Sequence, residues 1–325
     1  MKKWAYVLGA VAALGLLHWA VNELLIDGPV LQGRYYYQIL ILAGINIILA
    51  VSLNLTNGIT GQFSIGHAGF FAIGAYMAAC VSVYGGGGIR SALGFAPVWA
   101  QDSGLLVLAG LAGAAAAGLA GLLVGIPSLR LRGDYLAIVT LGFGEIIRVL
   151  ILNIDVVGGA RGFTGIPKLS NFFWVFFGVA ICILAVRNIE RSSYGRALLS
   201  IRENEIAAQA MGIPITRYKV LAFVIASAFA GLAGGLFAHF TMYLHTNTFT
   251  FVKSFEVIIM VSLGGLGSLA GSVLGAIILT LLPEVFRGFS EYRMVVYSLA
   301  LVLIMIYRPQ GILGRAGMLG RKKGG

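Results

Sequence analysis

The chain has 325 residues, of which 59% are hydrophobic and only 11% carry a charge. A soluble globular protein is about 45–50% apolar and about 25% charged, so this composition excludes a soluble fold, and it excludes intrinsic disorder as well. Lys and Arg outnumber Asp and Glu by 23 to 12, and this excess predicts either an anionic membrane surface or a nucleic acid beside the basic residues. The two cysteines, Cys80 and Cys182, both lie in apolar stretches and form neither a disulfide framework nor a metal-binding pattern.

Stretches without a charged residue indicate where the chain crosses a membrane. They cover residues 35–89, 103–129, 169–186, 220–252 and 257–283. A helix crosses the hydrocarbon core with about 20 residues, so the first stretch must contain more than one crossing, and the continuous apolar runs exclude a β-barrel. The sequence therefore predicts an all-α, polytopic membrane protein that forms a single transmembrane domain over residues 1–325. About ten spans are expected, near residues 4–21, 35–53, 68–84, 104–126, 135–152, 172–187, 219–240, 253–266, 269–286 and 293–307.

The positive residues predict the orientation, because cytoplasmic loops carry an excess of Lys and Arg. With the N-terminus in the cytoplasm, fifteen of the 23 basic residues fall in cytoplasmic segments, seven fall outside, and Arg148 lies within a span. Both termini are therefore expected in the cytoplasm, with the basic residues at a membrane surface and not on nucleic acid. Residues 1–21 also fit a signal peptide, but its removal would place the C-terminal basic cluster outside, so a retained first span is preferred.

Three segments are too polar or too rich in glycine for an ordinary membrane helix. Residues 54–67 place Asn, Thr, Gln, Ser and His between two apolar runs, and this pattern fits either a short polar loop at the surface or a broken helix along a substrate path. Residues 158–167 contain four glycines and are expected as an external loop, where the backbone could approach a solute closely. Residues 264–271 predict a tight or re-entrant turn between two short spans, because a dinucleotide-binding fingerprint would need a strand before it.

One pair of opposite charges lies inside a predicted span. Glu145 and Arg148 are three residues apart, so they can pair on one helix face. Charged residues within a membrane are rare and costly, and this pair is read either as structural or as part of a transport path or gate. Small residues at four-residue spacing indicate close helix packing rather than chemistry; they are Ala109 and Gly113, Gly121 and Gly125, Gly231 and Gly235, and Gly271 and Gly275.

The longest polar stretch, residues 187–219, lies on the cytoplasmic side in this topology. Residues 193–213 have a helix-forming composition, with apolar positions 198, 201, 208 and 211 on one face. Gly212 is expected to stop the helix, with Pro214 after it. Two readings stay open, a helix on the membrane surface and a segment that docks into a groove of a cytoplasmic partner.

These segments together resemble a known family. Residues Ile206 to Gly212 are similar to the coupling-loop pattern Glu-Ala-Ala-x-x-x-Gly of ABC importer permeases, although Ile206 stands at the position of the Glu and Glu205 is displaced by one. Further matching motifs follow the family's order, namely Asn54-Leu55-Thr56-Asn57-Gly58 through Gly69, Leu141-Gly142-Phe143-Gly144-Glu145-Ile146, Gly162-Phe163-Thr164-Gly165-Ile166 and Gly264-Gly265-Leu266-Gly267-Ser268. From about residue 35 to 313 the chain resembles the branched-chain amino acid ABC permease family, in particular its LivM-type subunit.

The resemblance implies a multi-pass protein of the bacterial inner membrane that works in an assembly. The expected partners are a homologous LivH-type permease, two cytoplasmic ABC ATPase subunits, a periplasmic substrate-binding protein and membrane lipid. The sequence has no G-x-x-x-x-G-K-[ST] loop, so we expect no ATPase site, no enzymatic activity, no cofactor and no metal in this chain. Segment 187–219 is then the cytoplasmic coupling segment, with contacts to the ATPases expected at Tyr194, Arg196, Arg202, Glu203, Glu205, Ala207, Ala208 and Gly212.

The substrate path is expected to use the polar breaks and the charged residue within a span. Its candidate residues are Asn54, Thr56, Asn57, Thr60, Gln62, Ser64, His67, Glu145, Gly162, Thr164 and Gly165. The resemblance favours branched-chain or other hydrophobic amino acids, while related permeases for urea and short amides leave a second substrate class open. A stand-alone, ion-coupled secondary transporter is expected to contain several buried acidic residues, and Glu145 is the only clear acid deep in a predicted span. An intramembrane enzyme is disfavoured, because neither a nucleophile–base pair nor a metal cluster is apparent.

Overall fold

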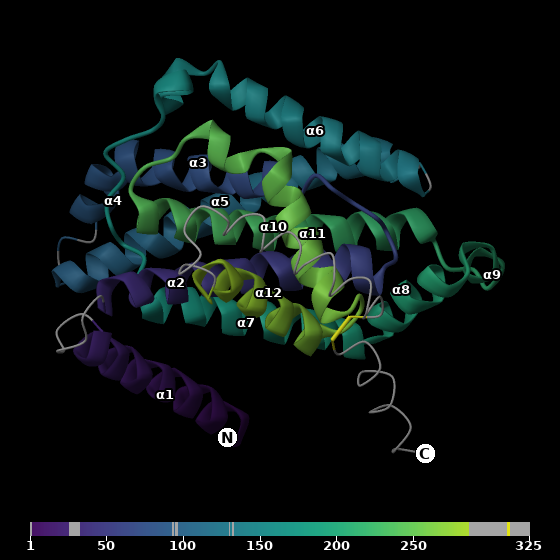
Figure 1. Cartoon of the computed structure of the whole chain (residues 1–325), viewed down its shortest axis with the longest axis horizontal. Helices are drawn as coiled ribbons and strands as arrows, with labels where there is room; N and C mark the ends of the chain where they lie inside the picture. The colour runs from purple at the N-terminus through teal and green to yellow at the C-terminus, as the bar shows by residue number, and fades with distance from the viewer. Residues whose placement is uncertain are drawn as a thin grey trace.

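The computed structural model describes residues 2–25, 33–92, 94, 97–129, 131, 133–285 and 311–312. Over these ranges the regular secondary structure is all helical, and the one β-type contact is an isolated antiparallel bridge between Phe163 and Leu244. The predicted all-α class is therefore confirmed for the described part of the chain. The long helices lie roughly side by side, and α11 crosses them steeply (Figure 1).

Six helices are long and apolar enough to cross a membrane, counted over the described residues. They are α2 with the π-helix η1 (Gly33–Leu53 and Asn54–Ile59), α3 (His67–Tyr84), α5 (Val98–Ser128), α6 (Asp134–Leu152), α7 (Phe172–Arg191) and α10 (Ile215–Thr241). Each corresponds to one predicted span, and together they make a multi-pass membrane protein.

The other four predicted spans are not established as crossings. Residues 4–21 lie in helix α1 (Lys2–Leu25), and residues 269–286 correspond to the shorter apolar helix α12 (Leu269–Val285). The segment near 253–266 forms α11 (Phe251–Gly264), which has only 14 residues. The span expected at 293–307 lies outside the described residues. The total of ten spans therefore stays a prediction.

Helices α3, α5 and α10 form the tightly packed centre of the bundle. Gly74 of α3 lies directly against α10, since a Cβ placed on it would come within 2.2 Å of the Cα of Gly231. A Cβ on Gly113 of α5 would in turn come within 2.6 Å of the carbonyl oxygen of Gly74. Small residues allow such close approach of helices in lipid, where packing rather than the hydrophobic effect drives association. The packing predicted for the glycine pairs of these helices is confirmed.

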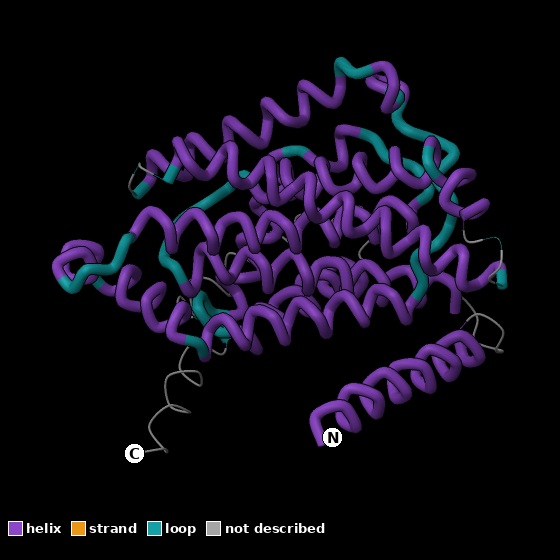
Figure 2. Tube along the Cα trace, turned by 180° about the vertical axis from the view of Figure 1, so that it is seen from behind, coloured by secondary structure: helices purple, strands orange, loops and turns teal. Residues whose placement is uncertain are grey.

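A second layer surrounds this centre. Helix α2 packs against α7, α10, α11 and α12, and α6 packs against α3. Helix α1 contacts α7 and α2 and forms an outer edge of the molecule, whereas α6 forms the opposite edge (Figures 1 and 2). The most buried part of the core lies on α2, where residues 45–53 are all buried.

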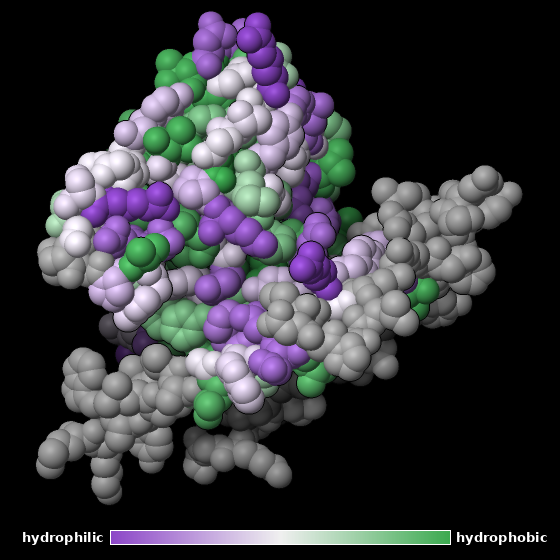
Figure 3. Space-filling model, turned by 90° about the vertical axis from the view of Figure 1, so that its left-hand side faces the viewer, coloured by the Kyte–Doolittle hydropathy of each residue, from purple (hydrophilic) through white to green (hydrophobic). Residues whose placement is uncertain are grey.

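The short helices mark the two ends of the bundle. Helix α4 (Gly86–Ala92) lies at one end, and α8 (Ser193–Glu203) and α9 (Glu205–Ala210) lie at the other (Figure 1). Hydrophilic residues are visible at the end that carries α4, with apolar residues between them (Figure 3). Helix α10 has 27 residues and is about 40 Å long, so it connects the two ends.

Candidate functional site

The polar break after α2 is buried inside the protein. Residues Asn54–Ile59 continue α2 as one turn of π-helix, and the chain then runs back without helical structure until α3 begins at His67. The predicted irregularity is confirmed, but the surface-loop interpretation is wrong, because Asn54, Thr56 and Thr60 are almost fully buried. Irregular backbone at membrane depth is tolerated only where protein or a cavity satisfies its polar groups.

The side chains of the break satisfy that backbone themselves. The amide of Asn57 donates to the carbonyl of Ser64 and accepts from the Ser64 N–H, both at 3.1 Å. The hydroxyls of Thr56 and Thr60 donate to the carbonyls of Leu53 and Leu55. These residues were predicted along a substrate path, and in the structure their side chains bond to the backbone within and beside the break.

Two further members of the predicted path behave in the same way, and a third does not. The His67 ring nitrogen Nε2 lies 2.9 Å from the Ser52 hydroxyl, and both residues are buried. The Asn54 carbonyl oxygen Oδ1 accepts from the backbone N–H of Gly267 at 2.8 Å, which ties the break to the turn between α11 and α12. Gln62 is buried as well, but neither atom of its amide makes a hydrogen bond within the described part of the chain.

The break contacts the segment predicted to couple to the ATPases. The Arg202 guanidinium, at the end of α8, donates through Nη1 to the carbonyl of Gly58 at 3.0 Å. Its Nη2 pairs with Glu203, whose side chain is 73% exposed. A Cβ on Gly58 would lie 2.4 Å from the N–H nitrogen of Gly267, so three chain segments meet here without room for a side chain. Sequence reasoning placed Arg202 at a partner surface and did not anticipate this internal contact.

The coupling segment itself is two helices rather than one. Asn204 separates α8 from α9, and its side chain accepts hydrogen bonds from the N–H groups of Ile206 and Ala207 at the start of α9. Such an Asn N-cap satisfies N–H groups that have no partner in the helix. The predicted stop at Gly212 is confirmed, with a φ of 80° just after α9.

The predicted apolar face of this segment divides between the interior and the surface. Leu198, Ile201 and Ala208 are buried against the rest of the chain, whereas Met211 is 83% exposed. Ile206, where the family pattern has Glu, is also exposed. Of the other predicted contacts, Arg196, Glu203 and Ala207 are exposed. A surface with exposed apolar side chains therefore remains on α9.

Tyr194 and an ion pair hold the coupling segment on the bundle. The Tyr194 hydroxyl donates to the carbonyl of Tyr218 at 2.6 Å, and the two rings stack. Burial raises the pKa of Tyr194, so the phenol stays protonated and keeps its donor. Glu205 pairs with Lys219, whose side chain is only 7% exposed.

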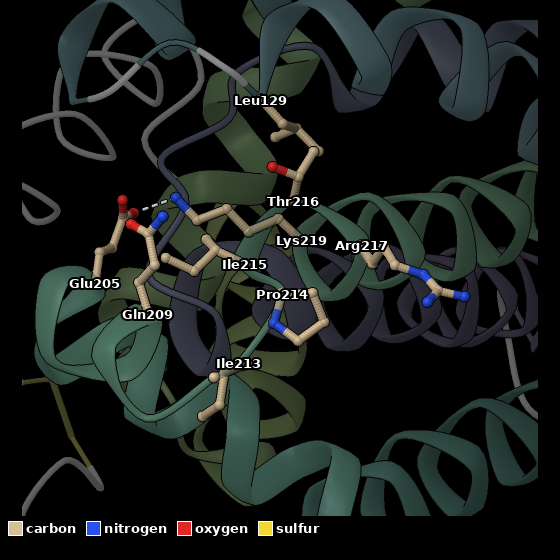
Figure 4. Close-up of a pocket in the computed structure, with 10 residues that line it drawn as sticks. Leu129, Glu205, Gln209, Ile213, Pro214, Ile215, Thr216, Arg217 and Lys219 are labelled. Carbon is tan, nitrogen blue, oxygen red and sulfur yellow. Dashed lines mark hydrogen bonds and ion pairs between the residues drawn. The ribbon is translucent and has the colours of Figure 1, made fainter.

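A cavity of about 600 Å³ lies between α9 and the start of α10. Lys219 extends toward Glu205 with Gln209 beside it, whereas Arg217 points away from the pair (Figure 4). Pro214 and Ile213 form another side of the cavity. This cavity borders residues that were predicted to contact the ATPases. Its wall contains the Glu205–Lys219 ion pair and the chain that follows Gly212.

The glycine-rich segment 158–167 lies at the opposite end of α10 from the break. Phe163 exchanges both backbone hydrogen bonds with Leu244, just after α10 ends. Gly162 is buried beside Tyr243, while Thr164 and Gly165 are exposed. The structure therefore separates these three residues from the break, so the predicted path residues other than Glu145 form two groups at different ends of the bundle.

Glu145 does pair with Arg148, at 2.7 Å, as predicted. The other carboxylate oxygen of Glu145 accepts from the backbone N–H of Phe251 at 3.0 Å, at the start of α11. Glu145 therefore fixes the beginning of α11 in addition to its ion pair.

A second cavity, of about 420 Å³, lies between α2, α10, α11 and α12. Its polar wall contains Asn46 of α2, Lys253 and Glu256 of α11, and Thr280 of α12. This group was not predicted from the sequence, because Asn46 lies in an apolar run that was read as an ordinary span. A polar amide in the middle of an apolar span was the available signal for it.

Over its described residues the chain has six membrane-length helices, a buried polar break and a polar cavity, which together define a multi-pass membrane protein of the class that includes permeases. Residues 35–307 match the family model described as branched-chain amino acid transport system / permease component. The chain belongs to this family.

Two similar proteins are named as high-affinity branched-chain amino acid transport system permease protein LivM. The one from Salmonella typhimurium is 38% identical over 94% of this chain and 76% of its own length, and the one from Escherichia coli K12 is 39% identical over 90% and 73%. The Escherichia coli K12 permease protein LivH of such a system is 32% identical over 49% of this chain and 52% of its own length. No solved structure matches the chain.

Proposed function

We propose that this chain is the LivM-type permease subunit of an ATP-driven importer of branched-chain amino acids. The observation that carries the proposal is the match over almost the whole chain to two permeases named for that transport. About half of this chain is similar to about half of a LivH permease. This similarity supports a homologous permease as the partner with which the chain forms the substrate path. The chain acts as one permease domain in a bacterial inner membrane.

The energy source in this proposal is a pair of ATPase subunits bound at the end of the bundle that carries α8 and α9. Segment 187–219 is the coupling segment, and its exposed residues Ile206 and Met211 offer apolar contacts to a partner. The Arg202 bond to Gly58 gives movement of this segment a direct connection to the buried break. A periplasmic binding protein delivers the substrate at the opposite end, where Thr164 and Gly165 are exposed.

Reconstitution tests the function. The chain, a LivH-type permease, the two ATPases and the binding protein are placed in liposomes with ATP available to the ATPases, and uptake of radiolabelled leucine, isoleucine and valine is measured against urea and acetamide. We expect uptake of the three amino acids only when ATP and binding protein are both present. Ion-driven flux through the chain alone would overturn the proposal in favour of a secondary transporter, and uptake of urea instead of leucine would overturn the substrate.

Cysteine accessibility in cells tests the orientation. In a background with Cys80→Ser and Cys182→Ala, a single cysteine replaces either Ser200 on α8 or Thr164 in the glycine-rich segment, both of which are exposed. We expect a membrane-impermeant maleimide added from outside to label only the Thr164→Cys protein. Labelling of Ser200→Cys from outside would reverse the orientation.

A further inference from the structure

The cavity between α2, α10, α11 and α12 combines two kinds of wall. One side carries the polar groups of Asn46, Lys253, Glu256 and Thr280, and the other carries aromatic and aliphatic side chains that include Phe71, Phe237 and Leu279. Its volume, about 420 Å³, lies in the range of about 300–1,000 Å³ typical of small-molecule sites. An apolar pocket with a few convergent polar groups is the usual form of such a site.

The polar groups form a connected network that leaves one donor and one acceptor unused within the described part of the chain. The Lys253 ammonium donates to the Glu256 carboxylate at 2.9 Å and to the side-chain oxygen Oδ1 of Asn46 at 3.1 Å. The side-chain amide nitrogen of Asn46 donates to the Thr280 hydroxyl at 2.9 Å. An ammonium has three donors and a carboxylate two acceptor oxygens. Among the described residues, the third donor of Lys253 and the second oxygen of Glu256 make no hydrogen bond.

These charges lie at the start of α11 and line the cavity. Lys253 is in the first turn of the helix, and Glu256 follows it by three residues. The Lys253 and Glu256 side chains are only 19% and 33% exposed. Ionisable residues inside a membrane protein face a bundle interior or a water-filled cavity and point to a functional site.

We propose that this cavity binds the amino-acid substrate as a zwitterion, and this inference rests on the proposed function. Lys253 binds the α-carboxylate, Glu256 binds the α-ammonium, and Asn46 orients the pair. Phe71, Phe237 and Leu279 pack against the branched apolar side chain. A substrate with both charges replaces the Lys253–Glu256 contact by two new ion pairs and leaves the net charge of the cavity unchanged, whereas a neutral amide would leave the separated charges unpaired.

Substrate protection of a cavity cysteine tests the binding directly. Thr248, which lines the cavity and is exposed in it, is changed to Cys in the Cys80→Ser, Cys182→Ala background. Maleimide labelling of the complete transporter is then followed with leucine, with isopentylamine, which lacks the carboxylate, or with 4-methylpentanoate, which lacks the ammonium. Leucine at ten times its dissociation constant is expected to slow labelling about tenfold, and the two analogues to leave it within about twofold.

Variants of the two charges complete the test in the same reconstituted transporter. Glu256→Gln and Lys253→Met are expected to lower leucine uptake at least about tenfold and to abolish leucine protection, which corresponds to the loss of one charge-assisted contact. Glu256→Asp, which keeps the charge, should restore part of both. Asp102→Asn, which breaks the exposed Arg90–Asp102 ion pair at the other surface, is the matched control and should leave uptake and protection unchanged.

The outcomes separate this inference from the proposed function. If the unaltered transporter takes up no branched-chain amino acid, the proposed function fails. If it takes up leucine but leucine does not protect Thr248→Cys, or if both charge variants transport within about twofold of the unaltered protein, the cavity is not the binding site and this inference is overturned. If a charge variant fails to assemble, and leucine also does not protect Thr248→Cys in the transporter that keeps both charges, the ion pair is structural and this inference is overturned.

Discussion

The contact between Arg202 and Gly58 gives a specific prediction for coupling. Arg202→Met removes the guanidinium but keeps an apolar stem that can cover Gly61, which the Arg202 side chain touches now. The variant therefore removes the bond between the coupling segment and the buried break while it disturbs packing little. The carbonyl of Gly58 loses its donor, and Glu203 loses its ion pair at the surface.

The size of the effect follows from the geometry. A hydrogen bond to a charged group contributes about 1.5–3 kcal/mol, and we take the lower end because the Arg202 side chain is 33% exposed. The accompanying pair with Glu203 lies at the surface and adds little. About 1.5 kcal/mol corresponds to roughly a tenfold change in an equilibrium, so we expect leucine uptake per ATP hydrolysed to fall about tenfold.

The assay measures ATP hydrolysis and leucine uptake in the same proteoliposomes. ATP hydrolysis should stay within about twofold of the unaltered transporter, because the lost bond lies inside the permease and not at the nucleotide. Arg90→Met is the control, since it removes one positive charge and one surface ion pair at the other end of the bundle. An Arg202→Met transporter that keeps the unaltered ratio of leucine to ATP would refute the reasoning.

Two further predictions concern stability in detergent. Gly74→Ala should destabilise the protein by about 1–3 kcal/mol, because its Cβ would lie 2.2 Å from the backbone of Gly231 and neither helix can move aside cheaply. Gly142→Ala, with nothing within 4 Å, should be neutral or slightly stabilising, and equal Tm values for the two alanine variants would contradict this packing. Tyr194→Phe should cost about 1 kcal/mol through the lost bond to the carbonyl of Tyr218, measured as a lower unfolding midpoint, and an unchanged midpoint would show that ring stacking alone holds α8.

The membrane helices could be predicted because their signal is local. Charge-free apolar runs of about 20 residues are sufficient to find a span. The ends were less well predicted, since α5 begins at Val98 and not near residue 104 and includes the charged Asp102. A hydropathy pattern locates the apolar part of a helix and cannot detect a helix that continues into the polar surface.

The break and the coupling segment were predicted in place but not in structure. Polar composition indicated an irregular segment at 54–67, but the pairing of Asn54 with Gly267 joins positions 213 residues apart, which no local pattern contains. The division of the coupling segment at Asn204 did have a local signal, because Asn is a preferred N-cap residue and Glu205 follows it in the first turn. That signal was outweighed by the helix-forming composition on both sides.

Helix α11 connects the cavity to the buried break. At its start Lys253 faces the cavity, and just beyond its end the N–H of Gly267 is bonded to Asn54 of the break that Arg202 also contacts. The helix has only 14 residues, so it is a single rigid element of about 21 Å and cannot absorb a displacement as a long flexible connection would. If a shift of α8 moves the turn at Gly267, we expect α11 to carry Lys253 with it and so to change the geometry of the cavity.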